Sequence, residues 1–399
     1  MPLLIFNAFY TLTPVFENSN YFTVTPPSID LNLYQSNPSN IIRNFCIAPN
    51  GTHADLEVVI LPISDAFPGL DTTYKIVFKN KGTHSQSGTI AFTFPDNVSD
   101  LVAANPFISG QTANTLNWDF SDLLPFESRE ITVVLHLNSS SDVPPIYNGS
   151  IISLGAVVSS TNNDETPSDN SFNLNQMVDN NPTSNSTSCL QGDYIPVAAV
   201  GQYVHYLIRF ENNTNAVSPS IYLKDIIDIT KLDLNSIVQI SSSHLGKASV
   251  PELYYNGLEV RYKNINLPFD DNNNDGYFAF KIKTLPTLVQ GNSFTNSAQV
   301  YFWEVPPFTT DTATTFVGSL GELENDYEDT VGFYPNPATN QITFSQNVKS
   351  AVIYTIDGKL MPSKLEIDTI DVSHLSSGIY IVQITDENDS SVSQKLVKN

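Results

Sequence analysis

The sequence of 399 residues is 41% hydrophobic and 15% charged, so it has enough apolar material for folded cores and is longer than one core usually serves. Lys and Arg number 18 against 41 Asp and Glu, and the resulting net charge of −23 disfavours nucleic acid and anionic lipid as partners, because both repel a polyanion. No apolar run approaches the roughly 18 residues of a transmembrane helix.

Residues 1–50 contain one clearly alternating segment, Tyr21-Phe22-Thr23-Val24, followed by stretches rich in Pro, Ser and Asn. A couple of strands bury too little surface to fold alone, so we predict that this region is the tail of a truncated upstream β-module. The first residues also lack the basic start of a signal peptide. We therefore expect the natural start of an exported protein to lie upstream of Met1.

Residues 51–178 and 194–318 are each predicted to form an Ig-like β-sandwich. Apolar and polar residues alternate in short runs, for example at 56–60 and 131–135, and turn-forming clusters bound these runs. Residues 69–80 recur as residues 201–212, with Tyr, Ile and Phe spaced two apart in both copies. This spacing places the three side chains on one face of a strand, which we interpret as the core face.

In both copies an asparagine, Asn80 or Asn212, is expected to close the strand into a turn. The polar stretch at residues 179–193 is predicted to link the two sandwiches. We find no stretch with a helical hydrophobic period, so the fold class is predicted to be all-β.

The two cysteines, Cys46 and Cys189, are too few for a disulfide scaffold and lack the paired spacing of a zinc site. They could form one disulfide in an oxidising compartment, or they could be two small buried hydrophobic residues. The sequence leaves both alternatives open.

One loop has the composition of a calcium site. Asp270, Asp271, Asn273 and Asp275 bring side-chain oxygens to near-alternate positions, which a hard cation prefers, and a glycine follows. Counted from Asp271, the twelfth position is Ile282 rather than the glutamate of an EF-hand. A turn rich in Asp and Asn between two strands explains the same residues, so calcium is a candidate ligand and no other cofactor is expected.

Nothing in the sequence predicts a catalytic site. Residues 241–244, Ser-Ser-Ser-His, place a hydroxyl beside an imidazole, but no Gly-x-Ser-x-Gly turn occurs and the histidines lack metal-ligand spacing. We therefore expect no enzyme activity and no catalytic residues.

An acidic linker at residues 319–330 precedes a last unit at residues 331–399. This unit opens on Tyr-Pro-Asn-Pro, continues through an Asp-Gly-Lys hairpin turn and a Gly-Ile-Tyr strand, and finishes in Lys-Leu-Val-Lys. The residues of this ordered set are Tyr334, Pro335, Asn336, Pro337, Asp357, Gly358, Lys359, Gly378, Tyr380, Lys395 and Lys398.

This set resembles the type A C-terminal sorting domain of cargo of the type IX secretion system of Bacteroidota. The resemblance implies a small Ig-like β-sandwich that the secretion machinery reads, with the cargo secreted or tethered at the cell surface. Residues 40–318 are similar to an uncharacterised Ig-like pair that precedes such sorting domains in large flavobacterial surface proteins. No residue of either region is implied to be catalytic.

Three hypotheses about function follow. The two sandwiches form a stalk or spacer that displays an upstream module outside the cell; or one sandwich is an adhesin that binds a glycan or another surface ligand, assisted by calcium; or the chain is the non-catalytic C-terminal part of a secreted enzyme.

Overall fold

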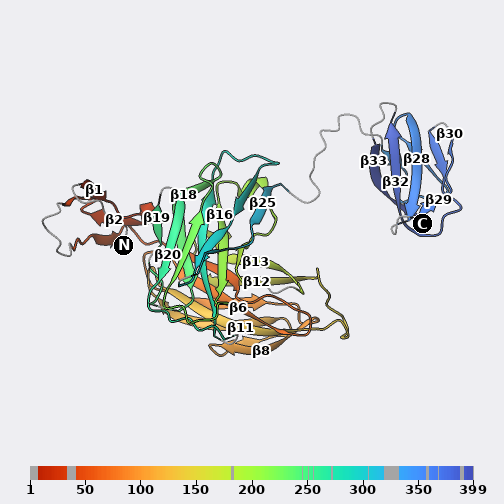
Figure 1. Cartoon of the computed structure of the whole chain (residues 1–399). Coiled ribbons are helices and arrows are strands. Elements are labelled where there is room, and N and C mark those ends of the chain that lie inside the picture. Colours follow the sequence, from red (N-terminus) through yellow and green to blue (C-terminus); the bar gives the residue numbers. More distant parts are fainter. Residues whose placement is uncertain are drawn as a thin grey trace. The chain divides into compact units, whose positions relative to one another are not determined.

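The structure, a computed structural model, describes residues 8–33, 42–180, 184–244, 246–249, 251–254, 256–270, 273–303, 305–318, 332–355, 359–366, 368–386 and 391–398. The chain divides into two compact units, Met1–Leu320 and Gly321–Asn399 (Figure 1). Within the described residues the fold is all-β, and helical geometry is limited to three 3₁₀ turns, Ser19–Tyr21, Pro167–Asp169 and Val197–Ala199. No helix in this part of the chain could span a membrane.

Sandwich 1 pairs a four-stranded sheet with a five-stranded sheet, both antiparallel. The four-stranded sheet has the order β5 (Leu56–Pro62), β6 (Asp71–Asn80), β11 (Ser128–Leu137), β8 (Ser99–Asn105). The five-stranded sheet has the order β13 (Ser171–Met177), β12 (Ile151–Ser160), β7 (Gln86–Thr93), β10 (Thr115–Leu123), β9 (Gly110–Gln111).

Sandwich 2 also has a four-stranded and a five-stranded sheet, together with a small third sheet. Its four-stranded sheet has the order β14 (Ser186–Cys189), β16 (Tyr203–Glu211), β21 (Asp275–Thr284), β18 (Leu232–Ser242). A five-stranded sheet has the order β19 (Glu252–Tyr254), β20 (Gly257–Tyr262), β17 (Ile221–Ile226), β23 (Ala298–Tyr301), β24 (Phe308–Thr309). A third sheet has the order β15 (Tyr194–Ile195), β25 (Ala313–Val317), β22 (Ser293–Asn296). Strand β14 lies inside residues 179–193, so part of the stretch expected to be a linker is a strand of sandwich 2.

The internal repeat corresponds to β6 and β16, which occupy the same place in the two four-stranded sheets. Their Tyr, Ile and Phe side chains are buried in the cores of their own sandwiches, which confirms the interpretation as core residues. Asn80 and Asn212 are fully buried and close the strands identically: Nδ2 donates to the carbonyl four residues later and to the carbonyl of Leu123 or Leu267.

The two sandwiches pack through their four-stranded sheets. Leu207, Tyr277 and Ala279 of sandwich 2 belong to the same apolar cluster as the core of sandwich 1. Strand β5 is consequently buried along its whole length, and β21 is buried from its second to its eighth residue. The alternation expected at residues 56–60 is therefore absent from the burial of β5, because both faces of this sheet are covered.

Four short strands precede sandwich 1 and form two two-stranded sheets. The first sheet pairs β1 (Ala8–Leu12) with β3 (Ile29–Leu33), and the second pairs β2 (Phe22–Thr25) with β4 (Cys46–Pro49). This N-terminal segment also contacts sandwich 1: Tyr21 stacks on His53 at 4.1 Å between ring centroids, and Phe22 lies 4.7 Å from Phe126.

The C-terminal unit is a small sandwich of two four-stranded sheets with its own core. One sheet has the order β26 (Phe333–Tyr334), β27 (Gln341–Phe344), β31 (Thr369–Asp371), β30 (Leu365–Glu366). The other has the order β29 (Leu360–Met361), β28 (Val348–Thr355), β32 (Gly378–Asp386), β33 (Ser391–Lys398).

Candidate functional site

A buried ion cluster lies where the N-terminal segment and the two sandwiches meet. Lys281 of β21 is only 2% exposed, and its Nζ lies 2.6 and 2.7 Å from the two carboxylate oxygens of Glu57 on β5. The same Nζ lies 2.6 Å from Glu17 Oε2 in the N-terminal segment. One ammonium group therefore ties together three separate parts of the first unit.

The electrostatics of this cluster keep its members ionised. Burial alone would raise the pKa of Glu57, but the attraction of the nearby Lys281 ammonium outweighs it and holds that pKa below its ordinary value. The pKa of Glu17 is lowered for the same reason, with Lys281 and Lys79 outweighing its burial. Burial pulls the pKa of Lys281 down, and the two carboxylates raise it further than burial lowers it.

His205 is buried beside this cluster and stays neutral, since burial lowers its pKa. Gln191 Nε2 lies 2.8 Å from His205 Nδ1 and donates to it, which leaves the ring proton on Nε2. Nε2 lies 4.0 Å from Glu57 Oε1, so the imidazole presents its N–H to the carboxylate.

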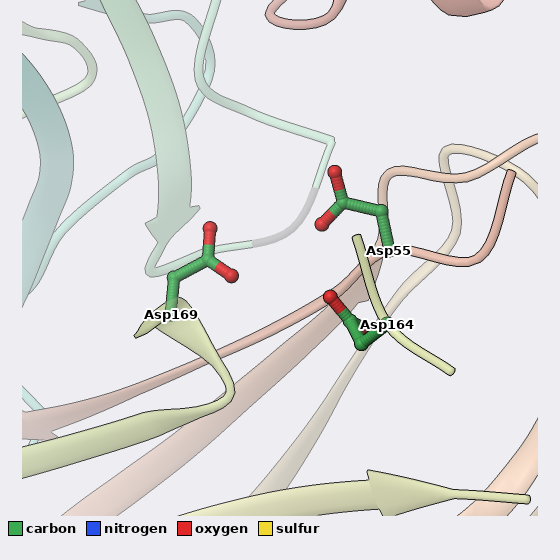
Figure 2. A group of neighbouring side chains, drawn as sticks. All are labelled: Asp55, Asp164 and Asp169. Atoms are coloured by element: carbon green, nitrogen blue, oxygen red, sulfur yellow. The ribbon is translucent and has the colours of Figure 1, made fainter. Parts of the chain in front are cut away.

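Three more carboxylates, those of Asp55, Asp164 and Asp169, face a common space, and one oxygen of each lies within 4.8 Å of one oxygen of the others (Figure 2). Such a group could hold a metal ion, but Lys81 supplies the cation here. Its Nζ lies 3.0 Å from Asp55 Oδ1 and also contacts Asp169 Oδ2. Burial is the main reason why the pKa of Asp169 is raised to about 7 and that of Asp55 is raised as well.

No motif in the sequence identifies these charged residues as a site, although one signal is present. Glu57 and Lys281 each interrupt an apolar run that is buried on both faces, and a charge in such a position needs a buried partner of opposite sign. Which partner it takes depends on how two strands far apart in the sequence meet, and no local pattern contains that information.

A cleft of about 780 Å³ opens beside the ion cluster, between the N-terminal segment and the two sandwiches. Its lining includes aromatic rings together with lysines and carboxylates, among them Phe16, Phe22, Phe126, Tyr203, Lys283 and Asp233. The Lys283 ammonium lies 5.0 Å from the centre of the Tyr203 ring, within range of a cation–π interaction.

The loop with calcium-site composition lies next to β21. Asn273 donates from its backbone N–H and from Nδ2 to Asp270, at 3.1 Å in both cases, as in a turn. Asp275 begins β21 opposite Glu211, and Asp271 lies outside the described residues. Both cysteines are free thiols in this structure, with Cys46 exposed on β4 and Cys189 half-buried on β14.

The serine–histidine pair that the sequence brought to attention is in hydrogen-bond contact. Ser243 Oγ lies 2.9 Å from His244 Nδ1 and accepts the backbone N–H of Tyr277 at 2.8 Å. Burial lowers the pKa of His244. The serine is thereby fixed to the strand next to it, which is a structural role for its hydroxyl.

In the C-terminal unit, the Tyr-Pro-Asn-Pro residues reach strand β33. Asn336 Nδ2 donates to the carbonyl of Lys395 at 2.6 Å, and Asn336 Oδ1 accepts the N–H of Val397 at 2.8 Å. The N–H of Ala338 then donates to the carbonyl of Val397 at 2.8 Å. The opening motif and the final strand, which lie at opposite ends of the unit's sequence, are therefore brought together.

The remaining sorting residues are placed around this junction and the adjoining strands. Gly378 pairs with Lys398, and Tyr380 is buried with its hydroxyl donating to the carbonyl of Ser376 at 2.9 Å. Lys359 is exposed and directly precedes β29. Tyr334, Pro335 and Pro337 are exposed, and Asp357 and Gly358 lie outside the described residues.

Two family models match the chain. Residues 332–399 match a secretion system C-terminal sorting domain, and residues 183–316 match a domain of unknown function, DUF7619. The second match covers sandwich 2 with its strand β14, which lies inside the expected linker. No curated protein matches the sequence.

Several solved structures are similar to parts of the chain. A collagen adhesin of S. aureus is 15% identical with a TM-score of 0.24, over 67% of this chain and 93% of that one. The MSCRAMM ACE of Enterococcus faecalis is 11% identical with a TM-score of 0.25, over 67% of this chain and 95% of that one. A cohesin of scaffoldin B from Acetivibrio cellulolyticus is 15% identical with a TM-score of 0.25, over 34% and 99%.

The match at residues 332–399 covers the same residues whose opening motif and last strand are joined by Asn336. The chain therefore carries a type IX secretion C-terminal sorting domain, and it is a protein that is exported to the cell surface or secreted.

Proposed function

We propose that residues 8–318 are a rigid, non-catalytic spacer that the C-terminal unit carries outside the cell, where it displays a module joined to its N-terminal side. The observation that supports this most is the buried junction between the sandwiches. Lys281, Glu57 and Glu17 come from three parts of the chain, and an ion cluster of this kind tolerates little relative movement because its charges have left water.

Limited proteolysis of the full chain tests the rigidity. Residues 179–193 and 319–330 were both predicted as linkers from their composition, but strand β14 lies inside the first. We expect a protease of broad specificity to cut first between residues 319 and 331 and to leave residues 8–318 as one resistant fragment. Early cutting within residues 179–193 would mean that the sandwiches move independently, and the spacer would then not be rigid.

Export has its own test. The full chain is expressed behind a signal peptide in a bacterium with a type IX secretion system, and its amount outside the cell is compared with that of a chain lacking residues 321–399. We expect the shortened chain to stay inside the cell. Equal export of the two chains would show that the sorting unit is dispensable.

A second candidate function, binding of a glycan or another surface ligand, is favoured by the cleft of about 780 Å³. Its aromatic rings could stack on sugar rings, and its polar side chains could orient hydroxyl groups. A glycan array with the parent and a Tyr203→Ala variant separates the candidates. The spacer predicts no binding, and array hits that disappear in the variant would favour the adhesin.

Calcium binding at Asp270, Asp271, Asn273 and Asp275 stays a proposal within this second candidate. A chelator and added calcium should leave the melting temperature unchanged for a spacer, whereas a rise of several degrees with calcium would support the adhesin. Enzymatic activity has a separate test, a hydrolase assay of the parent protein and a Ser243→Ala variant. We expect no activity from either protein.

A further inference from the structure

The sheet β29-β28-β32-β33 of the C-terminal unit has one face in the core and one face outside it. Across its four strands, Leu360, Tyr354, Ile381 and Lys395 lie directly opposite one another. Residues opposite one another on antiparallel strands point to the same side of a sheet, so these four share a face.

The neighbouring positions on three of these strands identify that face as the outer one. Ile353, Val382 and Leu396 each lie one residue from the row and are fully buried in the core. Because side chains alternate along a strand, the row containing Tyr354, Ile381 and Lys395 must point away from the core.

The outer face is unusually apolar for one directed at solvent. Leu360 is 60% exposed and Ile379 is 46% exposed, and Ile379 pairs with the half-buried Val397. An antiparallel sheet with one covered face normally presents polar side chains on the other. Apolar residues gathered on an outer face, rather than scattered singly, mark a contact surface.

The sorting motif is connected to this face through Asn336. Strand β33 is the edge strand of the sheet, and it supplies Lys395 and Val397 to the outer face. The two hydrogen bonds of Asn336 fall on the backbone of these same two residues. The motif that marks the family therefore fixes the strand from which part of this face is built.

We propose that this outer face, formed by Leu360, Tyr354, Ile379, Ile381, Val397 and Lys395, is the surface by which the secretion machinery binds the sorting unit. The partner is a protein surface with an apolar patch for Leu360 and Ile379 and a carboxylate for the Lys395 ammonium. Asn336 acts as a positioning residue that holds β33 in this surface. The proposal rests on export through the C-terminal unit and adds where on the unit the contact is made.

The test measures export of the full chain, expressed as above, for Leu360→Ser and Ile379→Ser. Both side chains are exposed, so we expect the melting temperature of each variant to stay within a few degrees of the parent. Export should fall at least about tenfold, since loss of a central apolar contact costs at least about 1.4 kcal/mol of binding. The matched control is Leu124→Ser in sandwich 1, where the leucine is 58% exposed and export should not change.

Other results would overturn the proposal in distinguishable ways. Export of Leu360→Ser and Ile379→Ser at the parental level would exclude the outer face as the contact surface. If Tyr334→Ser is the only one of the three variants that loses export, the contact lies on the other sheet, which contains β26. A dimer of the full chain that becomes monomeric in Leu360→Ser with export unchanged would identify the face as a self-association surface. If the chain without residues 321–399 is exported normally, the export function itself fails, independently of the face.

Discussion

Asp225 and Asn296 form a buried polar pair in sandwich 2. Asp225 of β17 is 1% exposed, and Asn296 donates from Nδ2 to its Oδ2 at 2.8 Å. The Oδ1 atoms of both residues are buried without a hydrogen-bond partner. Burial raises the pKa of Asp225 to about 7. When the Asp225 carboxyl is protonated, its O–H is a hydrogen-bond donor, which the two unpaired Oδ1 acceptors otherwise lack.

Asp225→Asn is therefore predicted to change the pH dependence of stability. The folded-state pKa of about 7 lies above the ordinary value of 3.8, so the group favours the folded state in acid, and this contribution is lost as the pH rises to about 7. The variant keeps a neutral side chain and should match the parent near pH 4 and exceed it by a few kcal/mol at pH 8. Urea unfolding at several pH values measures the difference.

Asp228→Asn provides a control of opposite sign, since hydrogen bonds from Thr230 lower the pKa of Asp228. The ionised form of this exposed group favours the folded state, so its replacement should lower stability above about pH 4. A difference between parent and Asp225→Asn that does not vary with pH would contradict the raised pKa.

Asn336→Asp tests the junction of the sorting unit. The substitution keeps the shape but places an oxygen where Nδ2 donated to the carbonyl of Lys395, so one hydrogen bond is replaced by repulsion. We expect a loss of about 1–3 kcal/mol in the stability of the C-terminal unit and reduced export. Thermal unfolding and the export assay measure the two effects, and Asn340→Asp in the following exposed turn is the control.

Lys281→Met removes the ammonium and leaves Glu57 and Glu17 buried without their shared cation. We expect a loss of about 3–5 kcal/mol in the stability of the first unit, as for other broken buried pairs. Lys283→Met is the matched control, because it lies on the same strand and near the same Tyr203 ring but is half-buried without such a pair of carboxylates. Similar losses for both variants would mean that the effect comes from strand β21 in general.

At the scale of elements, the sequence predicted the all-β class, several individual strands and both copies of the repeat. Apolar spacing locates β6 and β16, because their period-two side chains face their own cores. The same logic failed for β5, where Glu57 points into a second buried layer instead of solvent. It also missed β14, since Ser, Thr and Asn near residue 186 are as common in polar edge strands as in linkers.

The sorting site was predictable as a list of residues but not as a geometry. The order of Tyr-Pro-Asn-Pro, Gly-Ile-Tyr and Lys-Leu-Val-Lys identified the unit. The contact of Asn336 with the backbone of β33 could not be deduced, because side-chain hydrogen bonds between residues about 60 positions apart leave no local pattern.

The whole molecule consists of two compact units, one of which contains two sandwiches. The sandwiches share apolar residues and the Lys281 cluster, so they should unfold together, whereas the C-terminal unit has a separate core. The sequence predicted two sandwiches and a C-terminal unit, but it did not predict the apolar residues and the ion cluster that the two sandwiches share.

Calorimetry of the full chain should therefore resolve two unfolding transitions, one for residues 8–318 and one for the C-terminal unit. In Lys281→Met the larger transition should move to lower temperature or divide in two, while the smaller one stays in place. Three transitions in the parent protein would show that the sandwiches unfold independently.

The hydrogen bonds of Asn336 span 59 and 61 residues of sequence. A chain that ends between Asn336 and Lys395, whether it is still on the ribosome or has been shortened by damage, contains the Tyr-Pro-Asn-Pro motif. It lacks the strand to which Asn336 forms its hydrogen bonds. The sorting unit is therefore complete only after its last strand, β33, has been synthesised. Unfinished chains lack a complete export signal.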